Sequence, residues 1–184
     1  MGVNWAAGMI RWKPHVRRNG ETCALSHLHP FRFDIKFDAT AGQPARVVAI
    51  HVGFSCHVFT RRLDHAGPAP ELYSDDRETR AFDTERYEWS HLLRGIVISL
   101  ERRKCYFAGR EHFVSLELGG TPVGYEYRVF FTVRRRDAGS VELIVQSAYL
   151  GRVEEKPYGQ RQKQMRFRVI VSKVLLKQSL VEAR

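Results

Sequence analysis

An alternation of apolar and polar residues with a period of two is the feature that most constrains how this sequence folds. The clearest stretch places an aromatic or aliphatic side chain on every second residue, at Phe31, Phe33, Ile35 and Phe37. Such alternation predicts a strand that buries one face and exposes the other. Similar patterns recur along the chain, so that six strands are expected, over residues 31–38, 47–60, 113–118, 125–134, 141–150 and 165–171.

In one stretch, between the second and third expected strands, apolar residues recur every three to four positions instead. Its apolar residues include Leu92, Ile96 and Leu100, a spacing that predicts an amphipathic helix. Thr84 is the expected N-cap, and the basic residues 102–104 suit the negative end of the helix dipole. The order strand-strand-helix-strand-strand-strand-strand predicts an α+β fold, with an antiparallel sheet packed on one main helix.

The length of the chain favours a single domain. Its 184 residues suffice to bury one full core but rarely two. Residues 1–28 show no clear period and are expected to form an irregular N-terminal arm, so the α+β domain is assigned to residues 29–184. Residues 64–80 contain two prolines, a glycine and an acidic cluster, which predicts an exposed loop.

Composition excludes several classes of protein. With 43% hydrophobic and 11% aromatic residues, the chain is too apolar for a disordered polycation. No apolar run approaches the ~18–20 residues that span a bilayer, and residues 166–171 alternate like a strand, so no membrane partner is expected. The three cysteines, Cys23, Cys56 and Cys105, are too few and too dispersed for a disulfide framework, and no export signal is recognised. A reduced, cytoplasmic setting is therefore expected.

The formal net charge of +10 points to a polyanionic partner. Basic residues gather at the ends of the expected elements, where they can neutralise phosphates and release counterions. Aromatic residues beside them, such as Tyr106 and Phe107, suit the stacking of unpaired bases, so RNA is favoured over DNA. The expected nucleic-acid-binding residues are Arg61, Arg62, Arg102, Arg103, Lys104, Arg134, Arg135, Arg136, Arg166 and Arg168. A basic surface that is simply well solvated is the alternative interpretation of the same charge.

One segment carries the opposite charge. Residues 67–92 hold seven acidic and three basic residues, which gives the segment a formal charge of −4. This segment is a candidate contact surface for a protein partner, and in that case the chain acts as an adaptor.

Four residues have side chains suited to cleaving RNA without a metal. Such a reaction needs a group that takes the 2′-OH proton, a group that protonates the leaving oxygen, and cations that stabilise the phosphate. The expected catalytic residues are His57, Arg86, Tyr87 and Tyr149. His57 is the expected base because alternation places it off the core face of residues 47–60, and Arg86 and Tyr87 occupy the first helical turn. Each residue also has an ordinary structural interpretation, as a hydrogen-bonded histidine, a packed tyrosine or an ion-paired arginine.

Cysteine and histidine residues near the N-terminus raise the question of zinc. Cys23, His27 and His29 offer three ligands, and Cys56 or His57 could complete the set. The spacing matches no standard zinc finger, so no metal and no other cofactor is expected, although zinc at these residues stays open. Cys56 and His57 are not expected to form a nucleophile and its base, because neighbouring residues of a strand point to opposite faces.

Five short segments carry a resemblance to known proteins: residues 29–33 (HPFRF), 55–60 (SCHVFT), 80–90 (RAFDTERYEWS), 104–106 (KCY) and 145–149 (VQSAY). They resemble a family of bacterial proteins, often borne on mobile elements, that are labelled heat-shock or stationary-phase growth adaptation proteins. The resemblance extends over residues 29–175. It implies a role in stress without defining a reaction.

A helix that leads into a basic antiparallel meander is also similar in architecture to small metal-independent ribonucleases of the barnase and RelE type, which occur in toxin–antitoxin and phage-conflict settings. The combined expectation is an RNA-acting effector of a stress or phage and plasmid conflict system, with a metal-independent endoribonuclease as its enzymatic form. The alternative is a non-catalytic protein that binds nucleic acid or a ribonucleoprotein, for example an inhibitor of a host defence complex.

Overall fold

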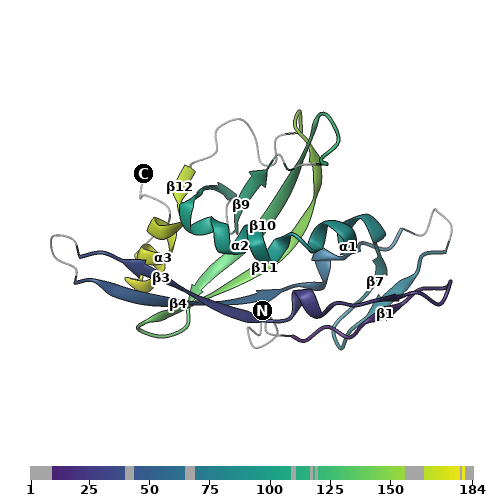
Figure 1. Ribbon diagram of the computed structural model, residues 1–184, viewed down its shortest axis with the longest axis horizontal. Helices are drawn as coiled ribbons and strands as arrows, with labels where there is room; N and C mark the ends of the chain where they lie inside the picture. Colours follow the sequence, from purple (N-terminus) through teal and green to yellow (C-terminus); the bar gives the residue numbers. More distant parts are fainter. Residues whose placement is uncertain are drawn as a thin grey trace.

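The computed structural model describes residues 10–39, 44–64, 69–108, 111–116, 118, 120–155, 164–178 and 180. Within these ranges the largest sheet has seven strands in the order β12-β8-β9-β10-β11-β4-β3 (Figure 1). Its strands are β3 (Phe31–Phe37), β4 (Arg46–Phe54), β8 (Lys104–Ala108), β9 (Glu111–Leu116), β10 (Tyr125–Arg135), β11 (Ser140–Arg152) and β12 (Gln164–Arg166). Neighbouring strands pair antiparallel except β4 and β11, which run parallel.

Two smaller sheets and several helices complete the described part of the chain. The smaller sheets consist of β1 (His15–Val16) with β2 (Thr22–Cys23), and of β5 (Thr60–Arg61), β7 (Thr79–Phe82) and β6 (Leu72–Ser74). The α-helices are α1 (Thr84–Ser90), α2 (Leu93–Ser99) and α3 (Phe167–Leu175). Short 3-10 helices are η2 (Ser26–Leu28), η3 (Cys56–Val58) and η4 (Leu100–Arg102).

The α+β fold class is confirmed, with one difference in the sheet. Strands were expected over residues 31–38, 125–134 and 141–150, and β3, β10 and β11 lie there. The sheet is mixed rather than purely antiparallel, because Ser140 of β11 pairs with Ala49 of β4 in a parallel register. Since β4 and β11 are far apart in the sequence, no hairpin forces them to run in opposite directions.

The core lies on one face of the large sheet. From β10, alternate residues such as Tyr127, Val129 and Phe131 are buried on this face. Phe167 of α3 packs edge-on against Phe131, with ring centroids 6.0 Å apart, and Trp89 of α1 lies 5.6 Å from Tyr127. The helices therefore cover the face predicted to be buried by the alternation along β10.

The expected strand over residues 165–171 is wrong beyond Arg166, where α3 begins. Phe167, Ile170, Val171 and Leu175 are buried, which is the spacing of one helical face, whereas Val169 is 42% exposed. A short run of apolar residues fits either period, so the alternation alone could not decide between strand and helix.

Two further boundaries differ from expectation. The strand predicted over residues 47–60 ends at Phe54, and η3 follows it. The helix predicted from Thr84 is divided into α1, α2 and η4, and its N-cap is Asp83, whose Oδ1 accepts a hydrogen bond from the Arg86 backbone N–H at 3.0 Å. Strand β8, directly after the helix, was not predicted.

The segments expected to be an arm and a loop both contribute to the core. Residues 10–28 include β1, β2 and η2, and Trp12 is buried while its indole N–H donates to the Phe54 carbonyl at 3.2 Å. The exposed loop predicted over residues 64–80 is wrong for its second half, where β6 and β7 form a hairpin that buries Tyr73. Residues 1–9 and 65–68 lie outside the described residues. No helix in the described ranges has the length and apolar character needed to cross a membrane.

Candidate functional site

The chain leaves the large sheet at Ser55, and this turn creates the candidate site. The Ser55 hydroxyl accepts a hydrogen bond from the His57 backbone N–H at 3.3 Å, and the Phe59 N–H donates to the Cys56 carbonyl at 3.1 Å. A serine hydroxyl commonly caps a helix in this way. Cys56 and His57 therefore project from the single turn of η3 rather than from a strand.

A second tight turn, between β6 and β7, faces η3. The Asp75 carboxylate accepts hydrogen bonds from the backbone N–H groups of Arg77 and Glu78, both at 2.9 Å. The Asp75 N–H in turn donates to the Glu78 carbonyl at 3.1 Å. An aspartate that bonds the backbone two and three residues ahead stabilises such turns, and here it fixes the position of Glu78.

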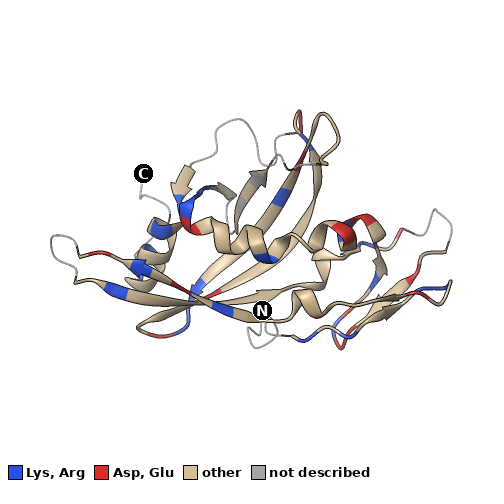
Figure 2. Ribbon diagram, viewed as in Figure 1, with Lys and Arg blue, Asp and Glu red and all other residues tan. Residues whose placement is uncertain are grey.

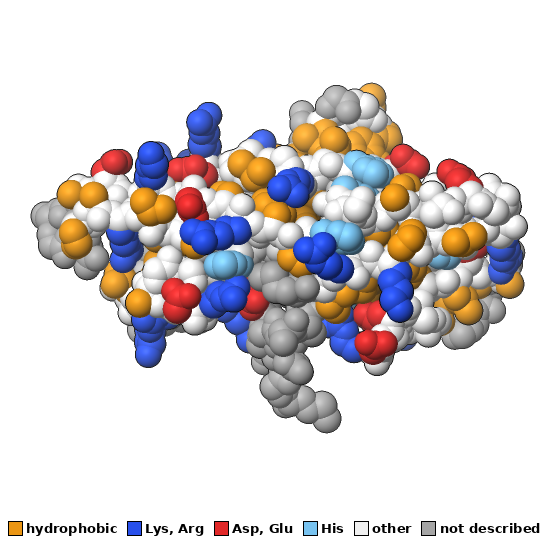
Figure 3. All heavy atoms as spheres, turned by 60° about the horizontal axis from the view of Figure 1, so that its bottom comes forward, with side chains coloured by type: hydrophobic (Ala, Val, Ile, Leu, Met, Phe, Trp, Pro, Cys, Tyr) orange, Lys and Arg blue, Asp and Glu red, His pale blue; other side chains and the backbone are white. Residues whose placement is uncertain are grey.

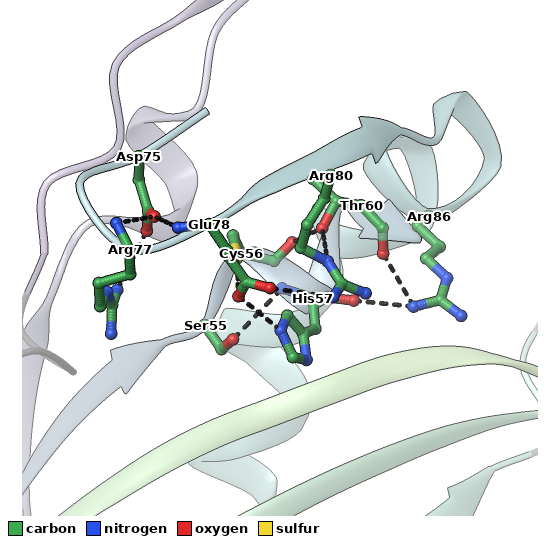
Figure 4. Close-up of polar contacts among 9 residues, drawn as sticks. All are labelled: Ser55, Cys56, His57, Thr60, Asp75, Arg77, Glu78, Arg80 and Arg86. Atoms are coloured by element: carbon green, nitrogen blue, oxygen red, sulfur yellow. Dashed lines mark hydrogen bonds and ion pairs between the residues drawn. The ribbon is translucent and has the colours of Figure 1, made fainter. Parts of the chain in front are cut away.

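The two turns bring a thiol, an imidazole and a carboxylate together. Glu78 Oε1 accepts a hydrogen bond from Cys56 Sγ at 3.3 Å and lies 2.8 Å from His57 Nε2 (Figure 4). The three ligand atoms lie within 4.8 Å of one another. The expectation that Cys56 and His57 point to opposite faces is wrong, because η3 replaces the predicted strand at these residues. We call these residues the Cys56–His57–Glu78 cluster.

Polar neighbours support the cluster from one side. Arg80 donates from Nη1 to Glu78 Oε2 at 3.1 Å and from Nε to the Thr60 hydroxyl at 2.9 Å. The Thr60 hydroxyl donates to the Cys56 carbonyl at 2.7 Å. The side chains of His57 and Glu78 are 38% and 39% exposed, against 16% for Arg80, so the cluster opens to solvent on the side away from Arg80.

The surroundings set the charges within the cluster. Burial, followed by the negative charge of Glu78, raises the pKa of the Cys56 thiol to about 12. Burial also tends to raise the pKa of Glu78, but the hydrogen bonds from His57, Cys56 and Arg80 together lower it. At neutral pH the pair is a neutral thiol beside a carboxylate, and a neutral thiol is a poor nucleophile.

The predicted catalytic residues are only partly brought together. Arg86 donates from Nη1 to the carbonyls of His57, at 3.0 Å, and Thr60, at 2.9 Å, and its guanidinium lies 5.3 Å from the Tyr149 ring centroid. Arg86 thus clamps the chain that follows η3. Tyr87 lies elsewhere, with its ring 5.0 Å from that of His91. His57, Arg86 and Tyr149 are neighbours, and Tyr87 does not join them.

Two of the predicted basic clusters meet at one end of the molecule. Strand β12 pairs with β8 so that Arg166 lies directly opposite Lys104. We call this group the basic end, which comprises Arg102, Arg103, Lys104, Arg166 and Arg168. Arg168 pairs with Glu101 at 2.6 Å, and Arg103 donates to the Ser99 hydroxyl at 2.8 Å. Arg102, Lys104 and Arg166 are exposed.

Among the other predicted basic residues, Arg61 and Arg134 have acidic neighbours. Arg134 pairs in register with Glu142, Arg135 donates to the Asp137 carbonyl, and Arg136 is near His51, whose pKa is lowered by burial and then by Arg136 and Arg32. Arg61 lies 3.7 Å from Asp83, and Arg62 is exposed. Figure 3 shows Lys and Arg side chains interspersed with Asp and Glu side chains on the side of the molecule where β3 and β4 lie.

The candidate zinc ligands near the N-terminus do not converge. His27 Nε2 lies 2.7 Å from the Ser90 hydroxyl, and burial lowers the pKa of His27 to about 4. His29 Nε2 lies 3.2 Å from the Trp12 carbonyl, and the Cys23 side chain is buried. Within the described ranges, the one group of three cysteine, histidine or acidic residues that could hold a metal is the Cys56–His57–Glu78 cluster.

Sequence reasoning missed Glu78, Arg80 and Thr60 as members of the site. The sequence did contain a signal for Glu78 and Arg80. Residues 72–74 alternate in burial, residues 79–82 pass from exposed to buried, and the polar turn at 75–78 lies between them, an arrangement typical of a hairpin. The contact of that hairpin with η3 has no local signal, because it joins residues about twenty positions apart.

Comparison with models of protein families gives a match over most of the chain. The model of the YjaZ family matches residues 14–175, a range that includes both the Cys56–His57–Glu78 cluster and the basic end. No curated protein and no solved structure matches the chain.

Proposed function

Since the chain belongs to the YjaZ family, a membership that specifies no reaction, we propose from its own geometry that it binds RNA through the basic end without cleaving it. In this proposal it is an effector of a stress or phage and plasmid conflict system. The observation that carries the proposal is the position of Lys104 directly opposite Arg166 in the β8–β12 pair.

Like charges that lie opposite each other destabilise a strand pair, so this arrangement favours a partner that neutralises both. The basic end holds five cationic side chains, and Glu101 is the acidic residue paired with one of them, Arg168. A phosphate backbone supplies the missing negative charge and gains free energy from the counterions it releases. Figure 2 shows Lys and Arg residues of η4, α3, β3 and β4 gathered toward the same end of the molecule.

An aromatic side chain beside these cations favours RNA with unpaired bases. Tyr106 lies two residues after Lys104 on β8, hence on the same face of the sheet, and it pairs in register with Gln164 of β12. Tyr106 is half-buried, so part of its ring is accessible. Bases stack on such rings, and amide groups bond to base edges, in proteins that bind single-stranded RNA.

The test measures RNA binding against salt. A fluorescent single-stranded RNA is titrated with wild-type protein, with Lys104→Ala/Arg166→Ala, and with the matched control Arg11→Ala/Lys13→Ala, a pair of exposed residues outside the basic end. Loss of two phosphate contacts is expected to reduce the slope of log affinity against log salt by about 1.4 and to weaken binding by roughly tenfold at low salt. The control is expected to bind like wild type. Wild-type binding that is absent at low salt, or unchanged in the first variant, contradicts the proposal.

A metal-independent endoribonuclease is the second candidate, favoured by one observation. His57 lies 2.8 Å from Glu78 and both are half-exposed, an arrangement in which a carboxylate orients a general base. Against this candidate, Arg86 Nη1 is already bound to two carbonyls and Tyr87 lies apart. Incubation of total RNA and tRNA in EDTA tests it, since cleavage by wild type that His57→Ala abolishes supports the enzyme over the binding protein.

A further inference from the structure

We infer that the Cys56–His57–Glu78 cluster is a binding site for one zinc-class divalent ion, separate from RNA binding at the basic end. The donor set consists of one thiol, one imidazole and one carboxylate. Zinc takes its ligands from these three groups, and first-row ions of intermediate softness share this preference. Magnesium and calcium require oxygen ligands alone, so a cysteine and a histidine in the set exclude them as the intended ion.

The distances between the donor atoms suit a small ion. Glu78 Oε1 lies 3.3 Å from Cys56 Sγ and 2.8 Å from His57 Nε2, and all three ligand atoms fall within 4.8 Å. With zinc bonds of roughly 2.0–2.3 Å, ligand atoms of a tetrahedral site lie about 3.3–3.8 Å apart. An ion therefore fits after an outward shift of about half an ångström by the His57 and Glu78 side chains. It replaces the thiol proton and the His57–Glu78 contact.

The supporting residues leave the ligand atoms free to face an ion. Arg80 binds the other carboxylate oxygen, Oε2, while Oε1 is the atom that meets Cys56 and His57. Thr60 holds the backbone of Cys56 through its carbonyl, and Asp75 holds the turn that carries Glu78. Such outer partners orient metal ligands and contribute to affinity.

Three protein ligands leave a fourth position of a tetrahedral ion for water. That position faces the open side of the cluster, because the His57 and Glu78 side chains are 38% and 39% exposed. Sites with three protein ligands and an open position are typical of zinc that binds a small anion or water, whereas purely structural zinc is enclosed by four. The ion also links η3 to the β6–β7 turn, two segments that otherwise meet through hydrogen bonds to one carboxylate.

Cobalt provides the decisive probe, since its bond to a thiolate absorbs in the near ultraviolet. The full chain is reduced, freed of metal with EDTA, and titrated with Co²⁺ and then with Zn²⁺. We expect one equivalent of Co²⁺ to give a thiolate charge-transfer band, and one equivalent of Zn²⁺ to remove it. Cys56→Ser is expected to abolish the band, and His57→Asn and Glu78→Gln each to weaken Co²⁺ binding by at least about tenfold.

Matched controls identify the cysteine and separate this site from RNA binding. Cys23→Ala removes a buried thiol outside the cluster and is expected to keep the band. The Lys104→Ala/Arg166→Ala protein is expected to keep it as well, while Cys56→Ser keeps the RNA affinity of wild type. Circular dichroism and thermal unfolding of each variant establish that it is folded.

Three results overturn the inference. The first is a folded wild-type protein that gives no charge-transfer band with micromolar Co²⁺. The second is a band that persists in Cys56→Ser, and the third is a band lost in Cys23→Ala, which assigns the ion to the N-terminal cysteine and histidines instead. Under the first result, the cluster is a hydrogen-bonded turn and nothing more.

Discussion

The basic end and the Cys56–His57–Glu78 cluster satisfy their charges in opposite ways. At the basic end, Lys104 faces Arg166 across a strand pair, and Glu101 pairs with Arg168. In the cluster, the single carboxylate of Glu78 is in contact with a thiol, an imidazole and a guanidinium. One region thus gains by attracting an external polyanion, whereas the other changes only if an ion displaces its internal hydrogen bonds. The basic end, whose charge is in excess, and the cluster, whose charges are already paired, therefore point to different kinds of ligand.

Arg86→Ala is the change expected to damage the cluster region most. It removes the donor to the carbonyls of His57 and Thr60, and carbonyls left without a donor in a partly buried site are costly. We expect a loss of about 2–3 kcal/mol in the free energy of unfolding, measured with urea. Arg62→Ala, at an exposed residue nearby, is expected to change stability by less than about 0.5 kcal/mol. Equal losses in the two variants would show that Arg86 is not a clamp.

Buried His112 makes the stability of the folded protein depend on pH, and this limits the pH range in which the two regions can be compared. Its side chain is 3% exposed, its Nδ1 lacks a hydrogen-bond partner, and burial lowers its pKa to about 4. The unfolded imidazole binds a proton near pH 6.5, so the contribution of neutral His112 to stability is complete above that pH and is lost as pH falls toward 4.

We expect wild-type protein to lose about 1 kcal/mol from this residue between pH 7.5 and 5.5, measured by urea unfolding at each pH. His112→Phe, between Phe107 and Phe131, is expected to lack this part of the dependence while His27 keeps its own. Identical pH profiles for variant and wild type would contradict the assignment.

Lys104→Glu has the smallest expected effect on stability and tests the comparison most directly. It converts a like-charged pair with Arg166 into an opposite-charged pair, so the folded protein is expected to gain about 0.5 kcal/mol. RNA binding is expected to weaken in the same variant. Lys104→Gln, which removes the repulsion without adding an attraction, should lie between the two in both assays. A variant that is less stable than wild type would show that the pair causes no strain.

The sequence predicts those strands in which apolar and polar residues alternate over many positions. Residues 125–134 alternate over ten positions and β10 covers this range, although Arg128 and Phe130 on its other face are buried as well. The run at 165–171 is too short to distinguish the two periods, and α3 occupies most of it. Ser55 ends β4 through a local cap, which its neighbours in the sequence do not reveal because the surrounding residues continue to alternate.

The candidate sites were less accessible to prediction because each depends on a contact between distant segments. His57 was singled out, but Glu78 lies in a segment interpreted as a loop, and its contact with His57 requires the β6–β7 hairpin. Basic residues were expected at the ends of the elements, and two groups of them meet through β8, a strand that was not predicted. The sequence shows which residues have side chains suited to catalysis or binding. Which residues they contact becomes clear only from the topology of the fold.

The parallel pairing of β4 with β11 has a consequence for synthesis of the chain. Ala49 cannot pair with Ser140 until the ribosome has added Ser140, 91 residues later. At roughly 5–20 residues per second, the β3–β4 hairpin spends on the order of 5–20 seconds with one strand edge unoccupied. During that interval β11 and α3 have not yet been synthesised, so the hairpin, whose buried residues include Ile35, Val48 and Ile50, lacks both. The nascent chain is therefore most prone to aggregation after its first hairpin forms and before its longest strand arrives.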